Sequence, residues 1–340
     1  MVMRIIRPGV LTTLQDTGRY CMQHLGVPIG GAMDAFALRT ANLLVGNTKD
    51  AAAFEVTLGG LSVYFEEEAL IAVTGASLPV RINEQPVPNW RPVRVPAGST
   101  LKLDRPNRGC RAYLSVAGGV DVPLVLNGRG TCLRANFGGH EGRALKQGDE
   151  LRVGNSSPIA QRFLHDLRNT TAGAAWTKWF IAQQFRPAYT NRPTVRAMIG
   201  PEHRWFTGSA SHDFFVHPYR TTPQVDRMGY RLQGPELTLQ SAQQLLSTAV
   251  TAGTVQVPPT GQPIVLLADA QTTGGYPRIA QVTQVDLPLI AQLQPGDHVH
   301  FHLVDEDQAR HALLQQERTL RSIQTAIALH AHTHSSRGIV

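Results

Sequence analysis

The sequence predicts a mainly β fold with a few helices. The chain has 31 glycines and 22 prolines among 340 residues, about 16% of the sequence. These two residues contribute roughly 12% of an average protein, so the excess indicates many turns. Short segments in which apolar and polar residues alternate, as in half-buried strands, lie between the turns. The clearest are residues 71–73, 93–95, 101–103, 113–116, 151–153, 194–199, 255–257, 264–267, 279–285 and 298–304.

Helical spacing interrupts the strands at three places. Asp34 can cap a helix over residues 35–45, which Gly46 ends well because glycine tolerates the left-handed conformation after a helix. Residues 161–185 have helical or irregular spacing. Residues 305–329 carry apolar side chains at helical spacing and predict a C-terminal amphipathic helix, followed by a loose end at 330–340.

The strands fall into two β-rich halves. The predicted parts are a first β-domain at 1–155, a helical or irregular connector at 156–190, a second β-domain at 191–304, and the C-terminal helix and tail at 305–340. Each half contains a strand, a turn with proline and glycine, a second strand and a Gly-Gly pair. This favours a duplicated β-domain, although β-rich chains also reuse the same turn residues by chance.

The charged residues argue against nucleic acid as a partner. The formal net charge is +7 and the pI is about 9.7, but the 32 basic residues include few lysines, namely Lys49, Lys102, Lys146 and Lys178. Arginine holds carboxylate or phosphate groups through a planar fork. Because no run of five or more basic residues occurs, a solvated basic surface is favoured over a nucleic-acid site.

Cysteine usage and hydropathy predict a cytoplasmic protein. Cys21, Cys110 and Cys132 are an odd number without a C-x-x-C spacing, so we expect neither a disulfide framework nor a zinc knuckle, and the thiols suit a reducing compartment. The N-terminus lacks the apolar core of a signal peptide. No stretch approaches the roughly 18 apolar residues of a membrane span, so no membrane contact is expected.

Two groups of histidines resemble parts of a metal site. His298, His300 and His302 would face the same side of a strand, but no clear ligand set completes them. A solvent-facing row at a sheet edge is favoured, and no metal is expected. The histidines near the C-terminus, at 330, 332 and 334, are expected to have no specific role.

Common nucleotide-binding and hydrolytic motifs are absent from the sequence. The phosphate cradle G-x-x-x-x-G-K-[ST] does not occur, and no G-x-G-x-x-G follows a strand into a helix. The H-E-x-x-H, G-x-S-x-G and kinase signatures are missing too. The chemistry of this chain must therefore come from other groups.

Polar groups in the first half concentrate in loops that contain glycine. Gln15-Asp-Thr-Gly-Arg19 places Asp16 three residues from Arg19. Gly26-Val-Pro-Ile-Gly-Gly-Ala-Met-Asp34 leads into the predicted helix, whose N-terminus offers free N–H groups to an anion. The alternative is that Asp34 only caps this helix.

Two polar segments stand out in the second half. Asp226-Arg-Met-Gly-Tyr-Arg-Leu232 alternates charged, apolar and aromatic residues around a glycine. Gln271-Thr-Thr-Gly-Gly-Tyr-Pro-Arg278 follows an apolar strand, and its Gly-Gly lets the backbone approach a ligand while the other residues supply directional donors. The alternative is a polar hairpin.

Several segments, in this order, resemble the KipA / allophanate-hydrolase-subunit-2 family, whose relatives include biotin-dependent carboxyltransferases. The segment Gly261-Gln-Pro-Ile-Val-Leu-Leu-Ala-Asp-Ala-Gln-Thr-Thr-Gly-Gly-Tyr-Pro277 is the most specific. The others are Leu11-Thr-Thr-Leu-Gln-Asp-Thr-Gly-Arg19, Gly31-Ala-Met-Asp34, Ala41-Asn-Leu-Leu-Val-Gly-Asn47, Tyr113-Leu-Ser-Val-Ala-Gly-Gly-Val-Asp121 and Arg227-Met-Gly-Tyr-Arg-Leu232.

This resemblance covers about residues 4–304 and implies two tandem cyclophilin-like β-barrel domains. Within the family, Ala270-Gln271 before Thr-Thr-Gly-Gly-Tyr-Pro in a chain of this size is most similar to the branch found in ATP-dependent 5-oxoprolinase. That branch implies two partners, the 5-oxoprolinase A subunit and the KipI-like B subunit. It also implies that 5-oxo-L-proline is opened to L-glutamate while ATP, with magnesium, is hydrolysed to ADP and phosphate.

Two alternatives to this activity stay open. One is a non-catalytic KipA-like regulatory module that binds a KipI-like partner, and the other is a subunit that processes urea or allophanate. The sequence also departs from the family pattern: Asn127-Gly-Arg-Gly-Thr131 stands where relatives often carry Gly-Ser-x-Ser-Thr, and Val225 stands where serine is common. No Met-Lys-Met biotin-attachment site occurs, which argues against biotin-dependent carboxyl transfer by this chain alone.

The implied activity gives the candidate residues chemical roles. A lactam amide is a poor electrophile, and transfer of phosphate to its oxygen would make attack by water feasible. Asp16 or Asp226 is the candidate catalytic base, unless each simply pairs with its neighbouring arginine. The candidate substrate-binding residues, with arginines to hold phosphate or carboxylate, are Arg19, Asp34, Arg227, Tyr230, Gln271, Thr272, Thr273, Tyr276 and Arg278.

Overall fold

The computed structural model describes residues 1–168 and 173–333 and confirms the predicted mainly β fold with a few helices. The chain separates into two compact units. Unit 1 comprises Met1–Gly18, Ala35–Pro187 and Arg318–Val340, and unit 2 comprises Arg19–Asp34 and Ala188–Glu317. The glycine-rich segment Arg19–Asp34, which lies within the predicted first domain, therefore belongs to the same unit as the second half of the chain.

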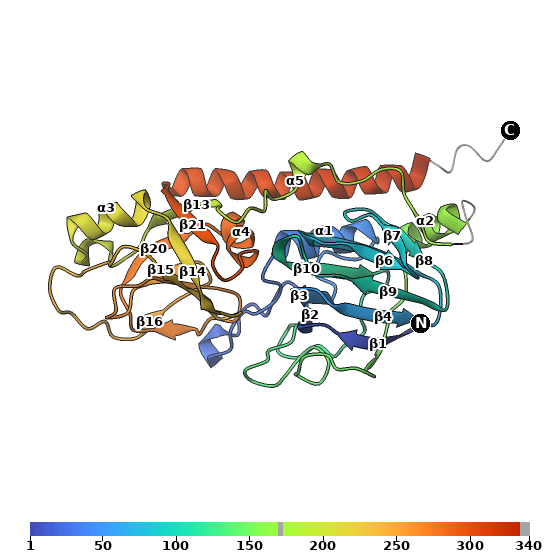
Figure 1. The fold of residues 1–340 in the computed structure, drawn as a ribbon, viewed down its shortest axis with the longest axis horizontal. Helices are drawn as coiled ribbons and strands as arrows, with labels where there is room; N and C mark the ends of the chain where they lie inside the picture. Colours follow the sequence, from blue (N-terminus) through green and yellow to red (C-terminus); the bar gives the residue numbers. More distant parts are fainter. Residues whose placement is uncertain (169–172, 334–340) are drawn as a thin grey trace. The chain divides into compact units, whose positions relative to one another are not determined.

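Unit 1 contains two six-stranded sheets that share one hydrophobic core (Figure 1). The strand orders are β11-β1-β4-β9-β6-β7 and β12-β8-β5-β10-β3-β2. Alternate side chains of both sheets, among them Phe54, Val63 and Leu114, fill this core. The strands are β1 (Val2–Pro8), β2 (Leu11–Gln15), β3 (Ala53–Thr57), β4 (Leu61–Phe65), β5 (Ala69–Ser77), β6 (Val80–Ile82), β7 (Gln85–Val87), β8 (Val93–Val95), β9 (Ser99–Leu103), β10 (Arg108–Val116), β11 (Glu150–Arg152) and β12 (Ala175–Trp176).

Unit 2 is built on a closed barrel with the strand order β13-β20-β17-β18-β15-β14-β21 (Figure 1). A separate two-stranded ribbon is formed by β16 (Thr248–Ala249) and β19 (Thr273–Gly274). Val255, Val265 and Phe301 are among the fully buried residues of the barrel core. The barrel strands are β13 (Thr194–Ile199), β14 (Tyr219–Val225), β15 (Gly229–Gln233), β17 (Thr254–Gln256), β18 (Ile264–Leu266), β20 (Arg278–Val282) and β21 (His298–Leu303).

The predicted helices are present. They are α1 (Ala35–Leu44), α2 (Pro158–Arg168) within the predicted connector, and α5 (Glu306–Thr333). A reciprocal cap fixes the start of α5, because Asp305 Oδ1 accepts from Gln308 N at 2.8 Å and Gln308 Oε1 accepts from Asp305 N at 3.0 Å. Within the described residues, no helix combines the length and apolar character that crossing a bilayer requires.

Some predicted elements fall on other structure or outside the described chain. The strand predicted at 279–285 ends at Val282, where a 3-10 helix (Gln284–Asp286) and α4 (Leu287–Ala291) take over, and α3 (Gly208–Val216) was not predicted. The remaining 3-10 helices are Gln23–Leu25, Gln183–Phe185 and His203–Trp205. Part of the predicted connector, 169–172, and most of the predicted loose end, 334–340, lie outside the described residues.

The expectation that His298, His300 and His302 form a row at a sheet edge is wrong. Their strand, β21, pairs in parallel with β13 and antiparallel with β14, so it closes the barrel. The intervening Val299 and Phe301 point into the core, so the three histidines face outward. Among the described residues, no group of three or more His, Cys, Asp or Glu could hold a metal ion.

In unit 1, the loop that follows β10 passes close to the backbone of Gly154, and this close approach depends on Gly118. Gly118 has φ +99°, and a Cβ there would lie 2.2 Å from Gly154 O. Gly148 also has a positive φ, +89°, but a Cβ there would meet no atom within 4 Å. We expect Gly118→Ala to reduce the free energy of unfolding by more than about 2 kcal/mol, and Gly148→Ala by only about 1 kcal/mol from backbone strain. Urea denaturation measures both, and equal losses would contradict the steric argument.

Candidate functional site

The glycine-rich segment from the N-terminal part of the chain packs against the barrel of unit 2. Gly30 N donates to Ala268 O at 2.9 Å, and Met33 is buried in the barrel core. Within the segment, Arg19 N donates to Ile29 O at 2.7 Å and closes it into a loop. These contacts bring the predicted segment 26–34 together with the loop that follows β18.

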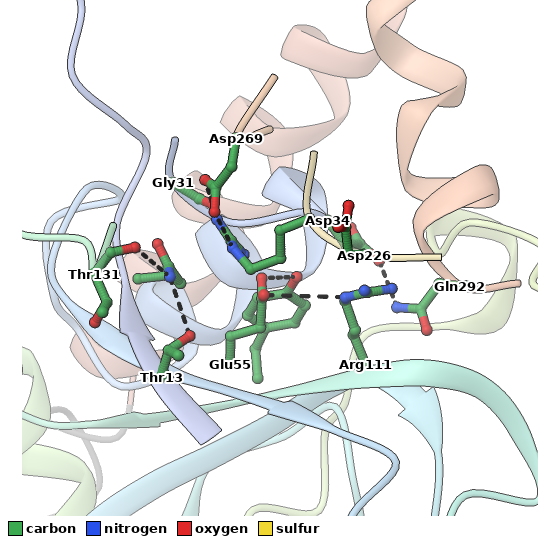
Figure 2. Close-up of polar contacts among 12 residues, drawn as sticks. Thr13, Gly31, Asp34, Glu55, Arg111, Thr131, Asp226, Asp269 and Gln292 are labelled. Carbon is green, nitrogen blue, oxygen red and sulfur yellow. Dashed lines mark hydrogen bonds and ion pairs between the residues drawn. The ribbon is translucent and has the colours of Figure 1, made fainter. Parts of the chain in front are cut away.

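Arg227 ties this segment to two other parts of unit 2. Its guanidinium binds Asp269 in a fork, with Nε to Oδ2 at 2.8 Å and Nη2 to Oδ1 at 2.9 Å. Nη2 also donates to the carbonyl of Gly31 at 2.6 Å (Figure 2). Both side chains are at least nine-tenths buried. A buried fork of this kind fixes both the β14–β15 turn and the Gly-rich segment.

Asp269 was not singled out from the sequence, although it lies inside the most specific family segment. Its signal is an acidic residue two positions after the apolar run Ile264-Val-Leu-Leu267. Nothing local shows that its partner is Arg227, because the two residues are 42 positions apart.

Arg19 and Asp34 lie at the two ends of the segment that packs on the barrel. Arg19 is 1% exposed. Its Nη1 and the Oδ1 of Asp269 each lie 3.5 Å from the position that a Cβ on Gly30 would take. Asp34 is fully buried, and its Oδ2 accepts from Tyr189 Oη at 2.6 Å and from Gln292 Nε2 at 2.9 Å. Asp34 directly precedes α1, and its side chain also accepts hydrogen bonds from Tyr189 and Gln292 of unit 2.

The two remaining candidates near this turn differ from each other. Asp226 is exposed, and its Oδ1 accepts from the backbone N of Met228 at 2.8 Å and of Gly229 at 3.1 Å. Tyr230 is fully buried in the barrel core, and its hydroxyl donates to Leu293 O at 3.4 Å. This position gives Tyr230 no surface toward a substrate.

The segment from Gln271 to Tyr276 covers part of the outside of the barrel. Gln271 Nε2 donates to Gln256 Oε1 at 3.4 Å, and Thr272 O accepts from Val250 N. Thr273 is exposed and belongs to the β16–β19 ribbon. Tyr276, 45% exposed, lines an open pocket of about 950 Å³.

Arg278 is held by a carboxylate that sequence reasoning missed, Glu202. Nε and Nη2 of Arg278 bind the two carboxylate oxygens of Glu202, each at 2.7 Å, and Nη1 donates to Ala249 O at 3.1 Å. Burial alone would raise the pKa of Glu202, but the fork from Arg278 outweighs it and lowers that pKa below its ordinary value. The same fork raises the pKa of Arg278. We expected this arginine to offer its fork to a ligand, yet the fork is already occupied within the chain.

Asp16 lies in unit 1 and organises backbone. Its Oδ1 accepts from Gly18 N at 2.9 Å and its Oδ2 from Arg129 N at 2.5 Å. Arg129 belongs to the Asn127-Gly-Arg-Gly-Thr131 segment, where the sequence departs from the family pattern. A Cβ on Gly130 would lie 2.7 Å from Gln15 Oε1 and 3.0 Å from Asp16 Oδ1, so glycine is needed for this close approach.

A second buried polar group in unit 1 was not predicted. Tyr113 donates its hydroxyl to Glu55 Oε2 at 2.7 Å, and Arg111 Nε lies 4.0 Å from Glu55 Oε1 (Figure 2). All three residues are at most 4% exposed. The alternation of Arg111 and Tyr113 with apolar residues along β10 was a usable signal, because it places both on one face. Glu55 in an otherwise apolar strand was another.

Comparison with known proteins gives the family. Residues 25–303 match the family described as carboxyltransferase domain, subdomain A and B. The chain belongs to this carboxyltransferase-domain family. The resemblance identified from the sequence motifs is thereby confirmed.

Members of the carboxyltransferase-domain family that resemble this chain differ in length. It is 42% identical to the C subunit of 5-oxoprolinase from Escherichia coli over 93% of this chain and 96% of that protein. It is 30% identical to urea amidolyase of Lachancea kluyveri over 94% of this chain but only 18% of that protein. The crystal structure of the Kluyveromyces lactis urea amidolyase superposes with a TM-score of 0.85 at 26% identity, over 95% of this chain and 20% of the other.

The Arg227–Asp269 fork predicts a large loss of stability when one partner is neutralised. Asp269→Asn keeps the shape but leaves a buried guanidinium without its counter-charge, so we expect a loss of about 3 kcal/mol in the free energy of unfolding. Asp226→Asn is the matched control, because an amide oxygen still accepts the two backbone bonds of an exposed turn, and we expect a change below about 0.5 kcal/mol. Urea denaturation distinguishes the two. Similar losses in both variants would contradict the role of the fork.

The lowered pKa of Glu202 predicts a pH-dependent stability. A carboxylate with a depressed folded-state pKa stabilises the fold fully above its ordinary value of 4.5, and this contribution is lost as the pH falls through the folded value. The difference in stability between the wild type and Glu202→Gln should therefore be greatest at neutral pH and shrink in acid. In an Arg278→Gln background that difference should no longer shrink in acid, because burial without the fork raises the pKa of Glu202. A difference that stays constant from neutral to acid pH would rule out the ion pair as its cause.

Proposed function

We propose that this chain is one subunit of an ATP-dependent 5-oxoprolinase, which opens 5-oxo-L-proline to L-glutamate and hydrolyses ATP to ADP and phosphate. Its partners in this proposal are the A subunit and the KipI-like B subunit. The reducing compartment favoured by the three free cysteines, the cytoplasm, is part of the same proposal.

The observation that carries the proposal is similarity along the whole length of one relative. The chain covers 96% of the Escherichia coli protein named as the C subunit of 5-oxoprolinase, at 42% identity. The relative of the same name in Haemophilus influenzae is 38% identical over 89% of its length. By contrast, the chain corresponds to only 18% of a urea amidolyase.

Within such an enzyme, the contacts of Arg227 and Arg278 indicate that these arginines position loops of the chain and do not bind phosphate. Arg227 and Arg278 each hold a carboxylate in a fork, and a phosphate would have to displace Asp269 or Glu202 to bind there. The chain also lacks the phosphate-cradle motif. We therefore assign ATP and its magnesium to one of the partners, and to this chain the positioning of the lactam.

Asp226 is the better supported of the two candidate bases. Both carboxylate oxygens of Asp16 accept backbone hydrogen bonds and are therefore already occupied in holding the loop. Asp226 is exposed and uses only Oδ1 for its turn, so its other oxygen is open to a proton.

Processing of urea or allophanate is the second candidate function. It is favoured by the TM-score of 0.85 with a urea amidolyase, which shows that the same fold serves in that enzyme. A non-catalytic KipA-like module that binds a KipI-like partner is compatible with the occupied arginine forks. These two alternatives differ from the first proposal in substrate or in the absence of chemistry.

Reconstitution tests the proposal directly. The full chain is combined with the A and B subunits, and ATP-coupled formation of glutamate from 5-oxo-L-proline is measured. We expect activity only when this chain is present, and no comparable ATP hydrolysis with urea or allophanate. Full activity of the A and B subunits without it would overturn the proposal.

Replacing Asp226 tests its role as the base. In the reconstituted enzyme, Asp226→Asn should lower kcat by about 100-fold or more, because an amide cannot accept the proton. Asp213→Asn, at another acidic residue on α3 of unit 2, is the control and should stay within about threefold of the wild type. A kcat for Asp226→Asn equal to that of the control would remove Asp226 from the mechanism.

A further inference from the structure

We propose that the open pocket beside Tyr276 in unit 2 binds an extended segment of a partner chain, and that an arginine or lysine of this segment pairs with Glu236. The inference rests on the proposed function, because the partner chains are the A and B subunits of that enzyme. All of the residues that line the pocket belong to unit 2.

Three loops of unit 2, which follow β15, β17 and β19, form the pocket. Its volume of about 950 Å³ lies at the upper end of the roughly 300–1,000 Å³ that is typical of ligand sites. Gly275, Tyr276 and Pro277 of its wall also belong to the sequence motif that is most specific for the family. The pocket thus has room for a ligand, and the family motif supplies part of its lining.

Most of the pocket wall is apolar. Pro258 and Pro277 are buried in it, and Leu239 and Leu245 are half-buried. Tyr276 adds an aromatic ring, and this residue is 45% exposed. Grooves lined by aromatic and apolar side chains are typical of sites that bind an extended peptide. The wall therefore offers such a segment a surface on which to pack.

The charge of the pocket comes from a single carboxylate. Among the residues that line the pocket, only Glu236 is charged. The stem of Glu236 packs against Gly261, because a Cβ on Gly261 would clash with Glu236 Cγ. Glu236 is exposed, and its carboxylate has no hydrogen-bond or ion-pair partner among the described residues. This carboxylate is therefore held at the pocket and is open to a cation.

Other carboxylates of unit 2 are already paired, since Glu202, Asp269 and Asp286 each bind an arginine. No lysine, arginine or histidine lines the pocket. The carboxylate of 5-oxo-L-proline and the phosphates of ATP would therefore meet no counter-charge there. The pocket suits a cationic group instead of the anionic substrates of the proposed reaction.

A basic side chain on an extended segment meets both requirements of the pocket. Arginine and lysine pack their methylene stems on apolar surface and keep the charged head accessible. That head pairs with a carboxylate and with the face of an aromatic ring. The pocket has the volume of a drug-sized ligand, so residues on either side of the basic one also find room. The proposed enzyme supplies such a segment, because two further chains assemble with this one.

The first test measures assembly of the full chain with the purified A and B subunits by biolayer interferometry, at low and at high salt. We expect Glu236→Gln to weaken assembly about tenfold at low salt, because the partner's cation loses its counter-charge in the interface. This difference should shrink at high salt, which screens the pair in the wild type. Glu306→Gln, at another exposed glutamate of unit 2, is the matched control. Equal affinities of Glu236→Gln and Glu306→Gln would overturn the inference.

A second variant closes the pocket without touching its charge. Ala242 is an exposed residue of the lining, so Ala242→Trp fills the space and leaves the barrel core intact. We expect it to weaken assembly by more than about tenfold, because the new ring occupies the place of the segment. Ala326→Trp, at an exposed position of α5, is the control, and thermal melting shows that each variant is folded. Wild-type affinity of a folded Ala242→Trp chain would contradict the assignment of the pocket.

Photo-crosslinking identifies the occupant. The photoreactive residue p-benzoylphenylalanine replaces Thr260, which is exposed and lies between the lining residues Pro259 and Gly261. In the assembled enzyme, mass spectrometry should find it joined to a segment of the A or B subunit that contains an arginine or lysine among apolar residues. Cross-links only to a second copy of this chain, or only to segments without a basic residue, would overturn the inference.

Failure of the inference and failure of the proposed function give different results. If the assembled enzyme forms glutamate while Glu236→Gln and Ala242→Trp both assemble as the wild type does, the function stands and the inference is wrong. If the wild type assembles through Glu236 but forms no glutamate from 5-oxo-L-proline, the inference stands and the function is wrong.

Discussion

The fork between Arg227 and Asp269 is the interaction on which the arrangement of unit 2 depends. It joins the β14–β15 turn to the loop after β18, and the same guanidinium holds the carbonyl of Gly31. A segment from the start of the chain is thus fixed against a barrel made from its second half. Because both charges are buried, each is costly without the other, and the fork specifies one position for the Gly-rich segment. Gly30 and Gly31 of that segment have positive φ angles, +65° and +78°, which glycine adopts without strain.

Carboxylate pairing also decides what the basic residues of this chain can do. A pI of about 9.7 and 28 arginines suggest a protein built to hold anions. In unit 2, however, Arg227 and Arg278 bind Asp269 and Glu202 through their guanidinium forks. Positive charge there is used to fix loops.

The sequence predicted local structure well and long-range partners poorly. Helix α1 was predicted to within a residue because capping and periodicity are local, and β13 was predicted at its observed bounds. The partners of Arg227 and Arg278 were missed because Asp269 and Glu202 are 42 and 76 positions away. The same reason explains β21: alternation predicted a strand, but only its parallel pairing with β13 shows that the histidines lie on a closed barrel. Tyr230 was chosen as a candidate because it lies in the polar motif Asp226–Leu232, but the same motif also supplies a side chain to the barrel core, and that side chain is Tyr230.

The buried polar side chains of unit 2 differ in how completely their hydrogen bonds are satisfied. Arg227, Arg278 and Asp34 have short hydrogen bonds of 2.6–2.9 Å to side chains of the same unit. Gln256 is 2% exposed and Thr248 is half-buried, and each keeps one buried polar atom without a hydrogen-bond partner in the described chain. A side chain selected only for stability would gain by being apolar at such a position, because burying an unpaired amide opposes folding.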